Sequence, residues 1–196
     1  AEPLRQQMAL ALAGQSGGKS FPPRPASRRE WETALASGGD PARGYRVFYS
    51  VPAGCAACHA VAGRGGDLGP DLTNVGQSKS RGQLVQAILA PSAEISPEYQ
   101  GWYIRRKDGQ VHQGRQIDVG EGAIDLLTPG AGFITVARDE VADYGMVEES
   151  LMPGGLEAGL TVEDLRGLIA FLAARPGNAE NGKQLVRTAS PARGGR

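Results

Sequence analysis

The sequence predicts a mainly α-helical domain into which a small antiparallel β-sheet is inserted. Three segments begin with helix-capping residues and continue with apolar side chains on one side, which is typical of amphipathic helices. Between the second and third of them, residues 99–148 show short strand-like runs separated by tight turns. The chain has 196 residues, which is enough for one domain with appendages.

Composition narrows the classes of function. Lys and Arg together number 21, as do Asp and Glu, so the formal net charge is zero and nothing favours binding to nucleic acid or to an anionic membrane. No apolar run reaches the length of about 18 residues that a transmembrane helix needs. Only 40% of the residues are hydrophobic and 6% are aromatic. A non-protein apolar body at the centre would therefore help this chain to fold.

The first two predicted helices have clear start and stop signals. Asp40 followed by Pro41 is typical of an N-cap and a first helical turn, and this helix is expected to end before Pro52. Ser80 can cap a helix over residues 81–90, which Pro91 stops.

The third predicted helix lies near the C-terminus. Thr161 and Asp164 form an approximate capping box, with Asp where Glu or Gln is usual. The helix runs through apolar residues that recur on one side, and Pro176 and Gly177 are expected to end it.

The inserted segment is predicted to form a sheet of three or four antiparallel strands. Strand-like composition is found at residues 102–107, 111–119, 123–128 and 133–136. Asp108-Gly109 and Pro129-Gly130 supply the turns between them.

Both cysteines lie in the pentapeptide Cys55-Ala56-Ala57-Cys58-His59. Thiols three positions apart on a helical turn project from one side, with Cβ atoms about 5–6 Å apart. Each sulfur can then form a thioether with one of the two vinyl groups of a haem, and the next imidazole lies beneath the ring, where a nitrogen can bind iron. The pentapeptide therefore predicts one covalently attached haem c, with Cys55, Cys58 and His59 as its binding residues.

Three other interpretations of the cysteines stay open. A redox dithiol normally follows a strand in a βαβ unit, whereas residues 50–54 are rich in Gly, Pro and Ser. A zinc site needs a second ligand pair, and His112 is the one histidine left. A disulfide across two residues closes a small strained loop and gives His59 no role.

Four segments together resemble a class I cytochrome c: Cys55–His59, Gly69–Leu72, Ser150–Leu156 and Thr161–Ala174. More narrowly, they are similar to the haem-binding domain family first described in planctomycete and verrucomicrobial proteins, where the domain often ends a larger polypeptide. The likeness covers residues 39–175 and implies a cytochrome c-like helical haem domain with an inserted sheet. It also implies that the Pro70 carbonyl accepts a hydrogen bond from His59, which fixes the imidazole tautomer.

Met152 is the candidate for the sixth iron ligand. It stands in a Met-Pro-Gly-Gly segment just before the last helix, and the resemblance places the ligand methionine there, after the insertion. A lone methionine is otherwise most often a core residue. Met146 and His112 are the alternatives, with His112 expected to be exposed on a strand, and Met8 lies outside the domain.

The resemblance implies single-electron transfer rather than catalysis, and no nucleophile–base pair or carboxylate dyad indicates an enzyme. His/Met ligation raises the potential of a low-spin haem, which suits transfer from a dehydrogenase-type donor to a respiratory cytochrome or oxidase. The alternatives are a haem-based sensor or gas-binding module with a displaceable sixth ligand, and a structural haem domain of a larger oxidoreductase. Thioether attachment takes place outside the cytoplasm in such bacteria, so the haem type implies a periplasmic or otherwise exported location.

The sequence divides into three parts. Residues 1–38 are predicted to form a helical extension and linker, with helices at residues 4–12 and 28–36; they are either the end of a preceding domain or an extension that packs on the core through Trp31. Residues 39–176 form the cytochrome c domain with the insertion at about 99–148. Residues 177–196 are polar and basic and are predicted to be a flexible tail. The insertion is interpreted as a cover over one haem edge or as a docking surface for a partner.

Overall fold

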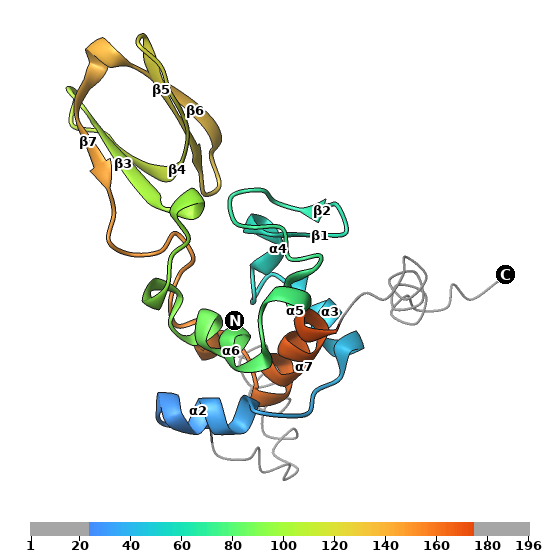
Figure 1. The fold of residues 1–196 in the computed structure, drawn as a ribbon. Coiled ribbons are helices and arrows are strands. Elements are labelled where there is room, and N and C mark those ends of the chain that lie inside the picture. The colour runs from blue at the N-terminus through green and yellow to red at the C-terminus, as the bar shows by residue number, and fades with distance from the viewer. Residues whose placement is uncertain (1–23, 175–196) are drawn as a thin grey trace, which may run out of the picture.

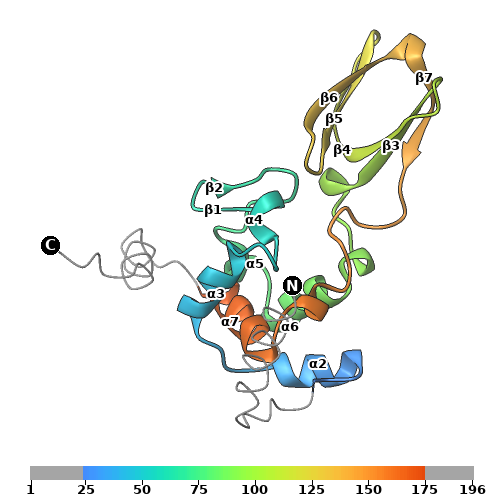
Figure 2. The same ribbon diagram turned by 180° about the vertical axis from the view of Figure 1, so that it is seen from behind.

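The computed structural model describes residues 24–174 and divides them into a helical lobe and a β lobe (Figures 1 and 2). About 38% of these residues are helical and 25% are in strands, so the prediction of a mainly α-helical fold is only partly right. Strands make up a larger share of the residues than predicted for two reasons. The inserted sheet has one strand more than predicted, and a separate short hairpin follows the Cys-Ala-Ala-Cys turn.

The described part of the helical lobe contains six α-helices: α2 (Arg28–Leu35), α3 (Pro41–Phe48), α4 (Cys55–Cys58), α5 (Val75–Ser78), α6 (Arg81–Leu89) and α7 (Val162–Ala173). The hairpin of β1 (Ala60–Val61) and β2 (Arg64–Gly65) follows α4. Short 3-10 turns lie at η1 (Pro91–Ala93), η2 (Pro97–Tyr99) and η4 (Leu156–Gly159), and a further one, η3 (Arg138–Glu140), lies within the β lobe.

The predicted helix starts are confirmed. Asp40 precedes α3, and its side chain accepts a hydrogen bond from a backbone N–H of the first turn. Ser80 and Gln83 form a complete capping box at the start of α6. Thr161 and Asp164 form one at α7, so the shorter Asp side chain does reach the N-cap backbone.

Helices α3 and α7 cross at two glycines. A Cβ atom on Gly44 would collide with the backbone carbonyl of Gly167, and a Cβ atom on Gly167 would stand 3.0 Å from the carbonyl oxygen of Asp40. The missing side chains let the two backbones approach closely, and Phe171 packs on the aromatic rings of α3 beside the crossing. This crossing joins the segment before the Cys-Ala-Ala-Cys turn to the last described helix.

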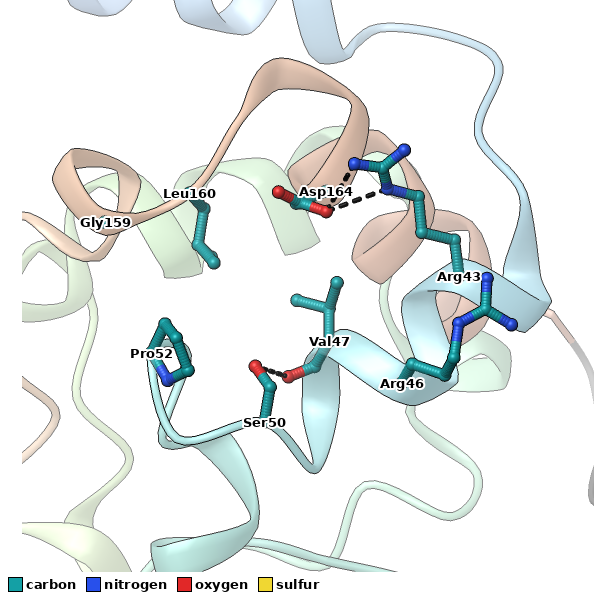
Figure 3. Close-up of a pocket in the computed structure, with 8 residues that line it drawn as sticks. All are labelled: Arg43, Arg46, Val47, Ser50, Pro52, Gly159, Leu160 and Asp164. Atoms are coloured by element: carbon teal, nitrogen blue, oxygen red, sulfur yellow. Dashed lines mark hydrogen bonds and ion pairs between the residues drawn. The ribbon is translucent and has the colours of Figure 1, made fainter. Parts of the chain in front are cut away.

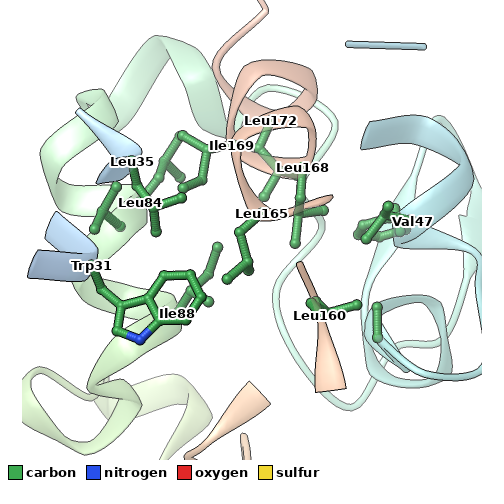
Figure 4. Packing of buried hydrophobic residues seen from close by; sticks show 13 residues of the cluster. Trp31, Leu35, Val47, Leu84, Ile88, Leu160, Leu165, Leu168, Ile169 and Leu172 are labelled. Atoms are coloured by element: carbon green, nitrogen blue, oxygen red, sulfur yellow. The ribbon is translucent and has the colours of Figure 1, made fainter. Parts of the chain in front are cut away.

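The core of the helical lobe is drawn from helices that are far apart in sequence (Figure 4). Leu165, Leu168 and Ile169 of α7 are buried at its centre. Trp31 of α2 is 6% exposed and belongs to the same cluster. Arg81 and Arg166 also donate hydrogen bonds to carbonyls at the end of α2, so this helix is bonded to the lobe as well as packed on it.

The β lobe is a curled antiparallel sheet with strand order β6-β5-β4-β3-β7. Its strands are β3 (Gly101–Arg106), β4 (Val111–Val119), β5 (Ala123–Thr128), β6 (Gly132–Ala137) and β7 (Val141–Met146). The prediction of three or four strands is wrong by the edge strand β7. The sequence Ala-Asp-Tyr-Gly-Met within β7 lacks the alternation typical of strands, and β7 forms because its backbone pairs with β3.

The sheet has its own small core. Ile104, Ile124, Leu126 and Val136 are almost fully buried within it, and among the described residues no strand of the sheet packs extensively on a helix. The two chain segments that connect the lobes meet in a neck, which we define as Gln100, Gly101 and Val147. There the Val147 N–H donates to the Gly101 carbonyl at 2.9 Å, and the Gln100 amide donates to the Val147 carbonyl at 2.6 Å.

Several predictions concern segments outside the described residues: the helix at 4–12, most of the linker that follows it, the helix stop at Pro176-Gly177 and the tail at 177–196. The division into residues 1–38, 39–176 and 177–196 stays a prediction. Within residues 24–174, no helix combines the length and the apolar character required to cross a bilayer.

A methyl group at position 44 would force the two crossing helices apart. We expect Gly44→Ala to lower the free energy of unfolding by about 1–3 kcal/mol, the range typical of overpacking in a close-packed interior. Gly82 of α6 has open space around its Cα and is the matched control. Gly82→Ala should leave stability unchanged or raise it by up to about 1 kcal/mol, since alanine is the better helix former. Denaturant titration measures both, and equal effects would contradict the role of the crossing.

Candidate functional site

The Cys-Ala-Ala-Cys segment forms a single helical turn, α4. Gly54 precedes it with φ +64°, a left-handed conformation that glycine adopts at little cost and that turns the chain into the helix. The N–H of His59 donates to the Cys55 carbonyl at 2.9 Å, so the imidazole follows directly on the turn that carries both thiols. Both cysteines are free and half-buried. The turn therefore places the two thiols and the imidazole in the order that thioether attachment requires.

The imidazole of His59 is oriented by a backbone carbonyl. Its Nδ1 lies 2.9 Å from the carbonyl oxygen of Pro70. A carbonyl only accepts hydrogen bonds, so Nδ1 carries the proton and Nε2 keeps a free lone pair. Burial lowers the pKa of His59, and the hydrogen bond to Pro70 opposes this only in part, so the ring is neutral near pH 7. A neutral imidazole with Nε2 free is the form that binds a metal.

A glycine-rich loop wraps the turn and contacts the imidazole. The Gly66 N–H donates to the Ala56 carbonyl at 2.9 Å, and the Gly69 N–H donates to the Cys58 carbonyl at 2.8 Å. A Cβ atom on Gly69 would stand 2.8 Å from Nδ1 of His59 and closer still to Cε1, so the ring lies directly against the Gly69 backbone. Sequence reasoning missed this contact, although a glycine directly before the predicted acceptor Pro70 was a signal for it.

The thiol environment bears on the alternative of a redox dithiol. Burial raises the pKa of the Cys55 thiol to about 11, and burial also raises the pKa of Cys58. A reactive dithiol depends instead on a thiolate whose pKa is lowered by nearby positive charge or a helix N-terminus. Within residues 24–174, no three or more His, Cys, Asp or Glu side chains lie together as ligands of a metal ion would.

The candidates for a sixth ligand are separated by the fold. Met152 is half-buried and packs against the core of the helical lobe. Its N–H donates to the Ser150 hydroxyl at 3.1 Å, and the Ser150 N–H donates to the hydroxyl of Ser92 in η1 at 3.0 Å, so the chain just before Met152 is anchored to η1. Met8 lies outside the described residues.

The two alternatives, Met146 and His112, belong to the sheet. Met146 is 64% exposed at the end of β7. His112 is half-buried in β4 opposite the buried Ile104, so the expectation that it is exposed is wrong: cross-strand neighbours share one face of a sheet, and the face of Ile104 is the one that packs inward. Among these described candidates, Met152 alone is part of the helical lobe that carries His59.

The described helices also border an open pocket of about 390 Å³ (Figure 3). It is lined by residues of α3, the loop after it, η4 and the start of α7, and the ion pair between Arg43 and Asp164 closes one side. None of the predicted haem-binding residues lines this pocket, so its position gives no reason to place the haem there.

Comparison with known protein families gives a match that includes the Cys-Ala-Ala-Cys turn. Residues 41–116 match the family model described as Cytochrome c. A cytochrome c domain is therefore present, which supports a c-type cytochrome and implies covalently bound haem c, haem-based electron transfer and redox partners in general. The match covers the turn, the glycine-rich loop and α6 but ends within β4, before Met152. The search of curated proteins gave no significant match.

The residues present fit a covalent haem. The two free thiols lie on one helical turn, and the neighbouring imidazole is neutral, with Nδ1 bound to a carbonyl and Nε2 free. The haem-binding roles of Cys55, Cys58, His59, Pro70 and Met152 stay predictions, as does the narrower resemblance to the planctomycete and verrucomicrobial family.

The contact between Gly69 and the imidazole can be tested by adding one methyl group. In Gly69→Ala the ring of His59 must move, so we expect it to lose its hydrogen bond to Pro70 and the protein to lose about 1–3 kcal/mol of stability by overpacking. Nitrogen-15 NMR of the imidazole reports the protonation and hydrogen bonding of Nδ1. Gly122→Ala is the control, because Gly122 has open space around it. An unchanged Nδ1 signal in Gly69→Ala would contradict the proposed contact.

Proposed function

We propose that this chain is a monohaem c-type cytochrome that carries single electrons from a dehydrogenase-type donor to a respiratory cytochrome or oxidase. The observation that carries this proposal is the Cys55–His59 turn with its imidazole oriented by Pro70, within a cytochrome c domain. Haem c, when bound, supplies one iron that gains and loses a single electron.

In this proposal the chain's own residues hold the group and exclude water from it. Cys55 and Cys58 anchor the haem through two thioethers, so it cannot dissociate between donor and acceptor. His59 binds the iron through Nε2, and the hydrogen bond from Nδ1 to Pro70 keeps the ring in one orientation and strengthens it as a donor. Half-buried apolar side chains around the turn, including Leu72 and Val75, belong to the lobe's core and keep the surroundings of low polarity.

Met152 is proposed as the second axial ligand. Its support is its place in the helical lobe and the anchoring of its segment through Ser150 and Ser92, which limits the freedom of the thioether. A thioether that stays bound in both oxidation states reduces the rearrangement that each electron transfer requires. We also propose a periplasmic or otherwise exported location, since thioether attachment takes place outside the cytoplasm in bacteria of this kind.

The covalent attachment is tested by the mass of the protein made in cells that mature c-type cytochromes. We expect the intact mass under denaturing conditions to exceed that of the polypeptide by one haem, and the pyridine haemochrome spectrum to indicate two thioethers. Cys55→Ala should leave one thioether, and the double variant Cys55→Ala/Cys58→Ala should lose covalent haem. A mass equal to the bare polypeptide would overturn the proposed function.

The sixth ligand is tested by the absorption of the oxidised holoprotein. We expect Met152→Ala to lose the weak red band of sulfur-ligated ferric haem and to lower the reduction potential, because methionine ligation raises it. Met146→Ala is the matched control and should keep the band. If the band survives in Met152→Ala and disappears in the control, Met146 is the ligand instead.

Two further measurements on the unmodified holoprotein separate the carrier from the alternatives. Cyclic voltammetry should give a reversible one-electron couple, whereas a structural haem has no couple within the physiological range. The ferrous form should bind carbon monoxide slowly, since Met152 must first leave. Rapid binding would favour a sensor or gas-binding module.

A further inference from the structure

Arg115 links the inserted sheet to the loop that contacts His59. Its Nη2 donates to the carbonyl oxygen of Asp67 at 2.7 Å, and its Nε donates to the carbonyl oxygen of Leu68 at 3.1 Å. The half-buried guanidinium also lies 5.4 Å from the centre of the Tyr99 ring. A planar fork with two donors on consecutive carbonyls restrains both peptide groups at once, which a single ammonium group cannot do.

The two carbonyls precede the residues that orient the imidazole. Leu68 is buried, so its carbonyl cannot easily exchange Arg115 for water. Gly69 follows and lies directly against the ring, and Pro70 accepts the hydrogen bond from Nδ1. A shift of the backbone at Leu68 therefore reaches both contacts of the imidazole within two residues.

The position of Arg115 is itself set by the neck between the lobes. Arg115 pairs across strands with Gly101, and Gly101 in turn accepts the hydrogen bond from the Val147 N–H. Side chains of Val147 and Leu151 pack closely around Gly101, so the backbone of the neck has little space in which to move. The sheet thus presents the guanidinium from a fixed point, although it has no extensive packing on the described helices.

We propose that Arg115 is a positioning residue for His59: it ties the sheet to the loop of residues 67–70 and thereby holds the imidazole in one orientation. The inference rests on the proposed function, in which His59 binds the haem iron. Arg115 acts through backbone carbonyls. The sheet then serves as a strut for the axial ligand, a role separate from covering the haem or docking a partner.

The test uses the holoprotein and two substitutions, Arg115→Gln and Arg115→Lys. Lys keeps the charge but not the fork, so both variants should free the loop. We expect the Gly69 amide, which is bonded to Cys58, to exchange its hydrogen about 10-fold faster or more, the effect of losing one or two hydrogen bonds. The NMR signal of the His59 Nδ1 proton should shift as well, which a general loss of sheet stability does not predict.

Arg105→Gln is the matched control. Arg105 lies on the neighbouring strand β3, and its guanidinium pairs with the carboxylate of Asp143 in β7 at 3.7 Å on the exposed surface of the sheet. This variant removes an arginine from the same sheet and should leave both signals unchanged. If Arg105→Gln gives the same changes, the effect comes from the sheet in general and the inference is wrong.

The remaining outcomes are equally decisive. Wild-type exchange at Gly69 and an unshifted Nδ1 signal in both Arg115 variants would overturn the inference while leaving the proposed function intact. A change in Arg115→Gln alone would support the positioning role of residue 115 and would overturn the requirement for the planar fork, since an ammonium group would then suffice. If the wild-type protein carries no covalent haem, the proposed function fails, and that result comes from the mass measurement, independently of the exchange rates.

Discussion

The hydrogen bond from Nδ1 of His59 to the Pro70 carbonyl is the interaction on which the site depends. It decides which ring nitrogen carries the proton and therefore which one is free to bind a metal. It also requires the loop after the turn to fold back, and the loop can do so because Gly66 presents bare backbone to the turn at Ala57 and Gly69 presents bare backbone to the imidazole. The thiols need only the local geometry of one helical turn, whereas the imidazole needs this long-range closure.

The described residues form two separate hydrophobic cores, one in the helical lobe and one in the sheet. The helical lobe gathers α2, α3, α6 and α7 around one apolar cluster, and its closest helix crossing has glycine on both sides. The sheet encloses four nearly buried aliphatic residues of its own. Because the lobes share no extensive packing among the described residues, the neck and Arg115 carry much of the connection between them. The neck is continuous in sequence with the segment of Met152, and Arg115 reaches the loop that contacts His59.

Much of the fold could be predicted where its signals are local. Capping residues correctly predicted where α3, α6 and α7 begin, and turn residues correctly predicted two hairpins of the sheet. Strand β7 was missed because its side chains carry no alternating pattern and its partner strand is about forty residues away. The exposure of His112 was predicted wrongly for a related reason: it depends on which face of the sheet packs inward, and its pairing with the buried Ile104 of another strand decides this.

The sequence by itself determined the chemistry offered at the turn, since the spacing of Cys55, Cys58 and His59 is contained within five residues and one helical turn. It also determined where most helices begin, because a cap needs only residues three positions apart. Tertiary structure alone decided that Gly69 lies against the imidazole, that Gly44 meets Gly167 and that Arg115 reaches the loop. Each of these contacts joins residues that local hydrogen bonding does not bring together, so they follow from the packing of the whole chain.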